Sequence, residues 1–226
     1  MQTVLLNTAL DHRLLKGKHR KLRADFKVNL DLRVHRALSW LQRAEQESED
    51  RDCAFVLLWI AFNAAYAEDI RDRGDERSSF ESFFNRIVDL DRDLRLYNAT
   101  WKRFAGPIRV LFDNPYVFQP FWNHQNGVAG FEDWEARLDR SRKRLQRALQ
   151  ELDTKVILSS LFDRLYVLRN QLIHGGATWN GAVNRAQVRD GAAILAYLVP
   201  LFIDLMMDHP EIEWPMPNYP VLEHKI

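Results

Sequence analysis

The chain has 226 residues, a formal charge of +1, 46% hydrophobic residues and 28% charged residues. This composition is typical of a globular domain with its own hydrophobic core, and it excludes disulfide scaffolds, fibrous proteins and wholesale disorder. A charge so close to zero also excludes attraction of an anionic partner by the chain as a whole, so nucleic-acid binding would depend on local basic patches.

Glycine and proline, the residues that most often interrupt helices, are rare in this chain. The 9 Gly and 8 Pro residues cluster, which leaves residues 18–73, 75–105 and 131–174 free of both. Chains built from strands need turn residues about every 8 to 12 positions, so stretches of this length favour helices. The sequence therefore predicts an all-α helical bundle, formed by residues 1–226 as a single domain.

The N-terminal helices are expected within residues 18–97. Leu30, Val34 and Leu38 recur at helical spacing and predict an amphipathic helix. Asp50 or Asp52 then resembles the N-cap of a second helix, whose residues 53–62 are apolar on every side. We expect this second helix to be central, with Cys53 as a buried apolar thiol.

A third helix is predicted to begin at Ser78 or Ser79, with an apolar stripe that includes Phe80, Phe83 and Phe84. After it, the acidic residues at positions 89, 91 and 93 imitate the first ligands of an EF-hand calcium loop. The sixth position of that loop is Leu94 instead of glycine, and the twelfth is Thr100 instead of glutamate. We interpret this string as the solvated face of a helix.

The rest of the chain divides into three segments. Residues 98–130 are predicted to be an insertion, because prolines and aromatic residues alternate there: Trp101, Phe104, Phe112, Tyr116, Phe118, Phe121 and Trp122. Helical spacing returns over residues 131–208, with a break near Asp153, a stop at Gly175 and Gly176, and a last helix from about Val183 to Asp208. Residues 209–226 hold four of the eight prolines and are expected to be extended.

The sequence lacks the motifs of several classes of enzyme and metal-binding domain. It contains no H-E-x-x-H, paired C-x-x-C, P-loop, G-x-S-x-G or G-x-G-x-x-G pattern, so we expect neither a metal nor a cofactor. Met1 to Gly17 does not resemble a signal peptide. The longest apolar run, residues 192–203, is too short to span a membrane. The single cysteine requires no oxidising compartment, so the sequence predicts a cytoplasmic protein without membrane partners.

The chemistry-bearing motif is at the predicted end of the helix that stops at Gly175. Arg169 and Asn170 are followed, after three residues, by His174. This arrangement resembles the R-x(4–6)-H signature of HEPN domains, which are all-α modules that usually dimerise. Many members of that family are metal-independent endoribonucleases. The resemblance implies a HEPN-like fold, a homodimer and a single-stranded RNA substrate.

Helical geometry limits how these side chains can meet. Asn170 and His174 are four residues apart and share a face, whereas Arg169 and His174 diverge by about 140° on an ideal helix. Convergence requires the Arg169 side chain to turn around the helix, the last turn to distort, or a second protomer to contribute. The resemblance implies the third arrangement, with two copies of the motif facing one another across a dimer cleft.

The reaction implied by the resemblance is attack of a ribose 2′-hydroxyl on the adjacent phosphorus. His174 can act as a base or an acid near neutral pH, and Arg169 is permanently charged and can stabilise the phosphorane. Asn170 is assigned to orienting the imidazole or holding phosphate. These three residues are the predicted catalytic set.

Further residues are candidates for supporting roles. Asn63 and Glu68 lie on the predicted central helix and could face the motif; a hydrogen-bonded core amide and an exposed carboxylate are the alternative. Candidate RNA contacts are Arg137, Arg140, Arg144, Arg147, Trp179 and Arg185. A charged run on a helix is also typical of an ordinary solvated face.

Two functions follow from this reading. The first is a HEPN-type endoribonuclease that acts as a toxin or defence effector, with an antitoxin or regulatory protein as a further partner. The alternative is a non-catalytic HEPN module for dimerisation or for binding RNA or nucleotides, in which Arg169 and His174 hold the helix interface.

Overall fold

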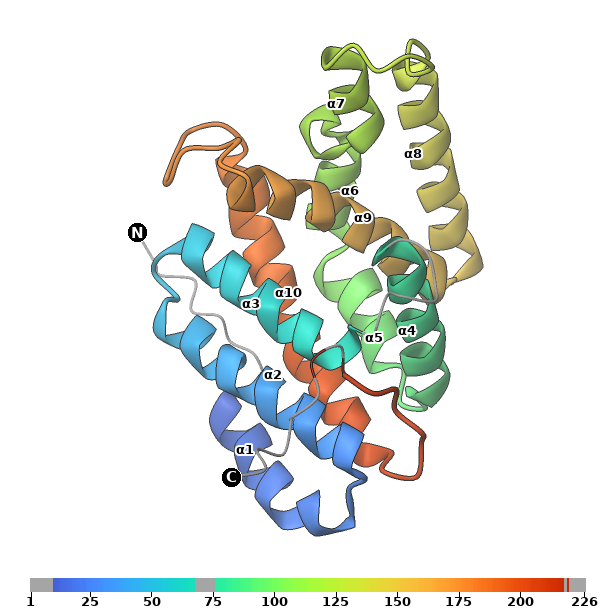
Figure 1. Cartoon of the computed structure of the whole chain (residues 1–226). Coiled ribbons are helices and arrows are strands. Elements are labelled where there is room, and N and C mark those ends of the chain that lie inside the picture. Colours follow the sequence, from blue (N-terminus) through green and yellow to red (C-terminus); the bar gives the residue numbers. More distant parts are fainter. Residues whose placement is uncertain (1–9, 68–75, 218, 220–226) are drawn as a thin grey trace.

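A computed structural model describes residues 10–67, 76–217 and 219, and its helices are shown in Figure 1. The α-helices are α1 (His12–Leu22), α2 (Val28–Gln46), α3 (Arg51–Tyr66), α4 (Glu76–Leu90), α5 (Arg95–Asn98), α6 (Ala105–Asp113), α7 (Gln119–Gln125), α8 (Trp134–Glu151), α9 (Thr154–Ile173) and α10 (Arg185–Asp208). Short helices η1 (Arg23–Asp25), η3 (Ala99–Arg103) and η4 (Pro115–Val117) connect them. These ranges contain no strand, which confirms the all-α prediction.

Helix α3 is central, as predicted, and packs against α2, α9 and α10. Its N-cap is Asp50, whose side chain accepts hydrogen bonds from the backbone N–H groups of Asp52 and Cys53 at 3.0 Å each. The prediction of a buried thiol was wrong, because Cys53 is exposed. In this first turn the side chains of Asp52 and Ala54 point inward, which leaves Cys53 facing solvent.

A cluster of aromatic rings from four helices lies within the core. Phe62 of α3 contacts Phe162 of α9 and Phe84 of α4, with ring centroids 4.5 Å and 6.0 Å apart, and Phe202 of α10 at 5.9 Å. All four side chains are fully buried. This cluster confirms the apolar stripe predicted for the third helix and fixes the relative positions of α3, α4, α9 and α10.

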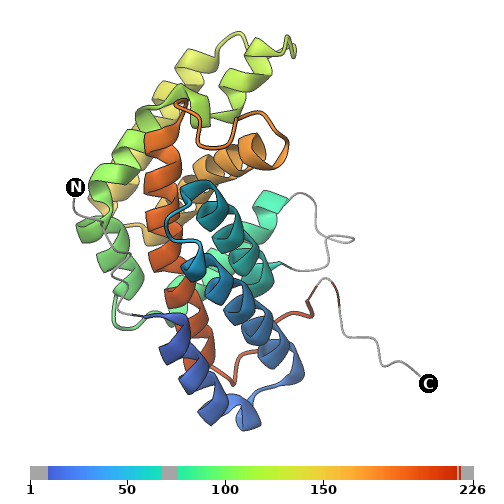
Figure 2. The ribbon, with the colours of Figure 1, turned by 90° about the vertical axis from the view of Figure 1, so that its left-hand side faces the viewer.

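Helix α10 runs the length of the bundle (Figure 2). It is long and apolar enough to cross a membrane by length and composition, but 83% of its most apolar window is buried within the fold. Burial on every side explains the apolar run, because a core helix has no face exposed to solvent. Its Gly191 lies against Phe55 of α3 and Leu165 of α9, where the helices approach closely.

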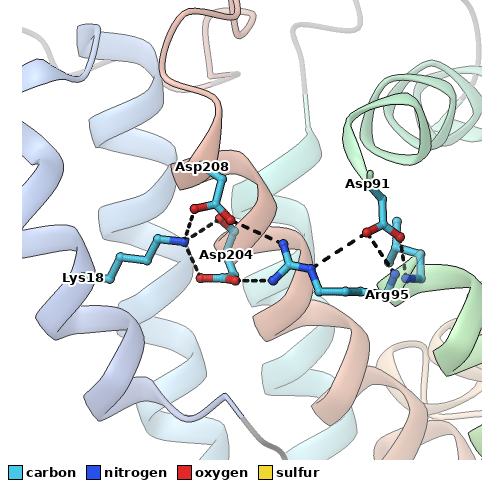
Figure 3. Close-up of polar contacts among 6 residues, drawn as sticks. Lys18, Asp91, Arg95, Asp204 and Asp208 are labelled. Atoms are coloured by element: carbon cyan, nitrogen blue, oxygen red, sulfur yellow. Dashed lines mark hydrogen bonds and ion pairs between the residues drawn. The ribbon is translucent and has the colours of Figure 1, made fainter. Parts of the chain in front are cut away.

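The C-terminal half of α10 carries an ionic network (Figure 3). The buried carboxylate of Asp204 forms ion pairs with Lys18 of α1 and Arg95 of α5, each at 2.6 Å. Asp208 accepts from the same two cations at 2.5 Å and 3.3 Å. The network joins α1 and α5 to α10, which explains a carboxylate in the largely apolar α10.

The string that imitates an EF-hand begins at the exposed Asp89 on α4 and continues as a turn after Leu90, so its interpretation as a solvated helix face holds for Asp89 and was wrong for Asp91. Asp91 is buried at the end of α4, and its carboxylate accepts the backbone N–H groups of Arg95 at 3.0 Å and Leu96 at 2.6 Å. It thereby satisfies the first donors of α5. The start of the third helix also differs from the prediction, because α4 begins at Glu76.

The predicted insertion, residues 98–130, is mostly helical. It contains η3, α6, η4 and α7, and in Figure 1 α7 and α8 project together from the body of the bundle. The described part of the tail forms a turn over residues 210–212, and its residues 213–216 belong to no helix or strand. It is held by Arg33, which donates to the carbonyls of Pro215 at 2.8 Å and Met216 at 3.2 Å. Residues 218 and 220–226 of the predicted tail lie outside the described residues.

Candidate functional site

The motif occupies the last turn of α9 and the residue that follows it. Asp153 caps the N-terminus of this helix by accepting the Val156 N–H at 3.0 Å. At the other end His174 is the C-cap, and its N–H donates to the Asn170 carbonyl at 3.0 Å. Gly175 then adopts φ +70°, a conformation that favours glycine, so the helix stops where the sequence predicted.

Arg169 is held beside the side chain of Asn170, which shares a helix face with His174. Its Nη1 donates to the Asn170 side-chain oxygen at 2.8 Å, and its guanidinium lies 5.9 Å from the centroid of the Tyr166 ring. Asn170 is about 40° from His174 around the helix, so this hydrogen bond narrows the angular gap between the cation and the imidazole. This contact favours the first of the three routes to convergence, turning of the Arg169 side chain around the helix.

The motif is open to solvent at its histidine. His174 is exposed, and Arg169 and Asn170 are half-buried. The Asn170 oxygen accepts from Arg169, which leaves its amide N–H groups as donors for another ligand. The observed role of Asn170 is therefore to hold Arg169, whereas sequence reasoning assigned it to the imidazole or to phosphate. An accessible imidazole beside an oriented guanidinium can exchange a proton and neutralise an anion.

A polar clamp fixes the loop that follows the motif. Asp52 of α3 accepts two hydrogen bonds from Arg185, at 2.8 Å and 2.5 Å, and a third from the backbone N–H of Asn180 at 2.8 Å. Asp50 accepts the Trp179 indole N–H at 2.7 Å. The Arg185 hydrogen bonds hold the pKa of Asp52 below its usual value, and backbone N–H donation from Cys53 does the same for Asp50.

The insertion is joined to the motif helix through Gln171. Its amide donates to the Tyr116 carbonyl at 2.5 Å, while its oxygen accepts from Asn184 at 2.8 Å. Sequence reasoning missed both this link and the clamp around Asp52. Asp52 was recognised only as a possible helix cap, and nothing local in the sequence indicates a partner 133 positions away.

The remaining candidates lie in different places. Asn63 is on α3, with a buried side-chain oxygen that has no hydrogen-bond partner. It is eleven residues beyond Asp52, or about 16 Å along the helix, so it lies at the opposite end from the motif loop. Glu68 lies outside the described residues. Trp179 and Arg185 adjoin the motif, but both are engaged by the clamp.

The four arginines of the predicted basic stripe are on α8, and they differ in environment. Arg137 is fastened to Asp133 at 2.6 Å and to the Gly130 carbonyl at 2.7 Å. Arg140 also contacts Asp133, at 3.2 Å. Arg144 and Arg147 are exposed. The stripe is thus partly neutralised, and its two C-terminal members offer the freer charges.

The described residues define a helical protein with an arginine, an asparagine and an accessible histidine at one end of a core helix. They include no group of three or more His, Cys, Asp or Glu side chains placed to hold a metal ion. No protein-family model matches the chain, and no curated protein or solved structure matches it. The resemblance to HEPN domains therefore stays a prediction from the sequence motif.

Proposed function

We propose that the protein is a metal-independent endoribonuclease of the HEPN type that cleaves single-stranded RNA. The observation that carries this proposal is the end of α9, where His174 is exposed and Arg169 is oriented by Asn170. The site thus offers the two groups that the reaction needs, a proton carrier and a fixed positive charge, on a surface that RNA can reach.

The proposed reaction begins when a neutral imidazole takes the proton of a ribose 2′-hydroxyl. The oxygen then attacks the neighbouring phosphorus, and Arg169 stabilises the charge on the pentacoordinate phosphorane. The bond from phosphorus to the 5′-oxygen breaks, and a protonated imidazole gives that oxygen its proton. The products are a 2′,3′-cyclic phosphate and a free 5′-hydroxyl, so atoms and charges balance without water or a metal.

This sequence of steps uses two imidazoles, and a homodimer supplies both. Three apolar side chains around the motif are exposed in the single chain: Ile173 is 47% exposed, and Trp179 and Val183 are each 73% exposed. Apolar residues gathered beside a candidate site are typical of a protein interface. We therefore propose that this end of α9 meets its copy across a twofold axis, with each chain contributing one His174.

The first prediction concerns His174. Substitution His174→Ala should lower the rate of single-stranded RNA cleavage by about 10² to 10⁴, the usual contribution of a general acid or base. Arg169→Gln should lower it by about 10² to 10³. Cleavage should persist in EDTA, and product analysis should find 2′,3′-cyclic phosphate ends. His35→Ala is the matched control, because His35 is exposed on α2.

Expression in cells gives a second readout of the same variants. A toxin or defence effector should arrest growth when produced alone, and His174→Ala should relieve the arrest. A co-produced antitoxin or regulatory protein should also relieve it. Cleavage that is unchanged in His174→Ala would overturn the catalytic assignment.

The alternative is a non-catalytic module for dimerisation or for binding RNA or nucleotides. The exposed Ile173, Trp179 and Val183 favour it as well, because an interface at this end of α9 does not require cleavage. It predicts a dimer that yields no cleavage product at any protein concentration, and a melting temperature that falls in His174→Ala.

A further inference from the structure

A cavity lies between α8, α9 and the insertion, away from the His174 motif. Its volume is about 310 Å³. It is lined by Val117, Phe118, Gln119 and Pro120 of η4 and α7, by Arg140, Ser141 and Arg144 of α8, and by Ser160, Asp163 and Arg164 of α9. A volume of this size suits a small organic ligand such as a nucleotide.

Arg164 is the unusual member of this set. It is only 2% exposed, and its guanidinium packs over the rings of Phe118 at 4.2 Å and Phe112 at 4.9 Å. Its Nη2 donates to Ser141 at 3.0 Å, whereas Nη1 has no hydrogen-bond partner. Buried charges in proteins are normally paired, so an unpartnered donor on a buried cation indicates a missing anion.

Burial lowers the pKa of Arg164 to about 10, although the nearby Asp163 acts in the opposite direction. The guanidinium is therefore still protonated at neutral pH, and its desolvation is compensated only in part. An anion in the cavity would supply the rest of that compensation. The two phenyl rings hold the guanidinium in place, so little side-chain entropy is lost when it binds a ligand.

Two further arginines stand at the same cavity. Arg140 and Arg144 are four residues apart on α8 and so lie on one face of that helix. Among the described residues Arg144 has no hydrogen bond or ion pair. Arg140 forms an ion pair with the exposed Asp133, which also pairs with Arg137. Asp163 is the one carboxylate in the lining, so three arginines and one aspartate give the cavity a formal charge of +2.

We propose that this cavity binds the phosphate monoester of a small molecule of about nucleotide size. A terminal phosphate carries close to two negative charges at neutral pH, which matches the charge of the lining. Arg164 lines the cavity but is only 2% exposed, so a small terminal phosphate can approach it more closely than an internal phosphodiester, which is flanked by chain on both sides. Phe118 and Pro120 provide an apolar wall for the group that carries the phosphate.

This site is separate from the proposed nuclease site. Arg164 and His174 are on the same helix, ten residues apart, which corresponds to about 15 Å along the axis. The inference goes beyond the proposed function and does not depend on it. His174→Ala should therefore bind phosphate esters as tightly as the wild type, whatever it does to RNA.

The experiment is calorimetric titration of the full chain with AMP, ribose 5-phosphate and adenosine. We expect both phosphate esters to bind and adenosine not to bind. Arg164→Met should weaken AMP binding by about tenfold or more, and Arg144→Gln by a smaller factor of about three to ten. Lys143→Gln is the matched control, because it removes a neighbouring exposed charge of α8 that does not line the cavity.

The proposal is overturned if neither ester binds at about 10 mM, or if adenosine binds as tightly as AMP. Binding of a 5′-phosphorylated oligoribonucleotide in the absence of AMP binding would also overturn it in favour of an RNA end. If Arg164→Met fails to fold, the test depends on Arg144→Gln, because Arg144 is exposed and its substitution should leave the fold intact. Wild-type affinity in that variant would show that the cavity is not where the phosphate binds.

Discussion

Asp52 joins the core to the candidate site. Its side chain is 10% exposed and accepts three hydrogen bonds from the loop and helix that follow His174. Hydrogen bonds to a charged group are stronger than neutral ones, and this carboxylate holds both Arg185 and the backbone of Asn180. The position of the motif loop therefore depends on a residue in the first turn of α3.

The second prediction is that Asp52→Asn destabilises the fold by about 2 kcal/mol at neutral pH, since Arg185 is partly exposed and its charge is partly screened. The pKa of Asp52 is lower in the folded chain than its usual value of 3.8, so ionisation favours folding. The contribution is complete above about pH 5, well above the unfolded value, and is lost as the pH falls through the lower folded value.

Urea denaturation at several pH values checks this. The difference in stability between wild type and Asp52→Asn should narrow as the pH falls from about 5 toward 2. The control is Asp139→Asn, an exposed position paired with Lys143, which should leave stability unchanged. Equal stability of wild type and Asp52→Asn throughout would mean that the clamp contributes nothing.

At the scale of helices, the close approach of α10 to α3 and α9 depends on Gly191. A Cβ atom at this position would lie 2.9 Å from a ring carbon of Phe55 and 3.1 Å from a methyl group of Leu165. Both are buried core residues with little room to move. Glycine is otherwise unfavourable in a helix, so packing is the reason for its presence here.

The third prediction is therefore that Gly191→Ala destabilises the protein by about 1 kcal/mol, because overpacking outweighs the gain in helix propensity. Gly17→Ala in α1 is the matched control, since nothing lies within 4 Å of the added Cβ. It should stabilise the protein by about 0.5 to 1 kcal/mol. Thermal melting measures the stability of both variants. Equal stabilisation by Gly191→Ala and Gly17→Ala would contradict the close approach of α10 to α3 and α9.

At the scale of the whole molecule, the fourth prediction concerns assembly. Ile173→Glu or Val183→Glu should convert the proposed homodimer to a monomer, because a buried carboxylate without a partner opposes association. RNA cleavage should fall with dimer content. Val28→Glu is the control, since Val28 is 80% exposed at the start of α2. Light scattering after size exclusion measures the mass, and a wild-type monomer that cleaves RNA would contradict the twofold site.

Local rules account for the parts of this structure that were predicted correctly. The spacing of apolar residues indicated α2 and α4, Asp50 capped α3, and Gly175 ended α9, because each depends on residues within about a turn. The errors at Cys53 and Asp91 have a common cause. Whether one side of a helix or turn faces water is decided by the elements packed around it.

The sequence by itself determined the helical class, the helix caps at Asp50 and Asp153, the stop at Gly175 and the presence of Arg169, Asn170 and His174 beside that stop. The tertiary structure alone decided which side chains meet: Asp52 with Arg185, Gln171 with Asn184, and Arg164 with Ser141. Helical periodicity depends on residues close together in the sequence, whereas these contacts join separate elements. They exist only after burial of the aromatic core has brought those elements together.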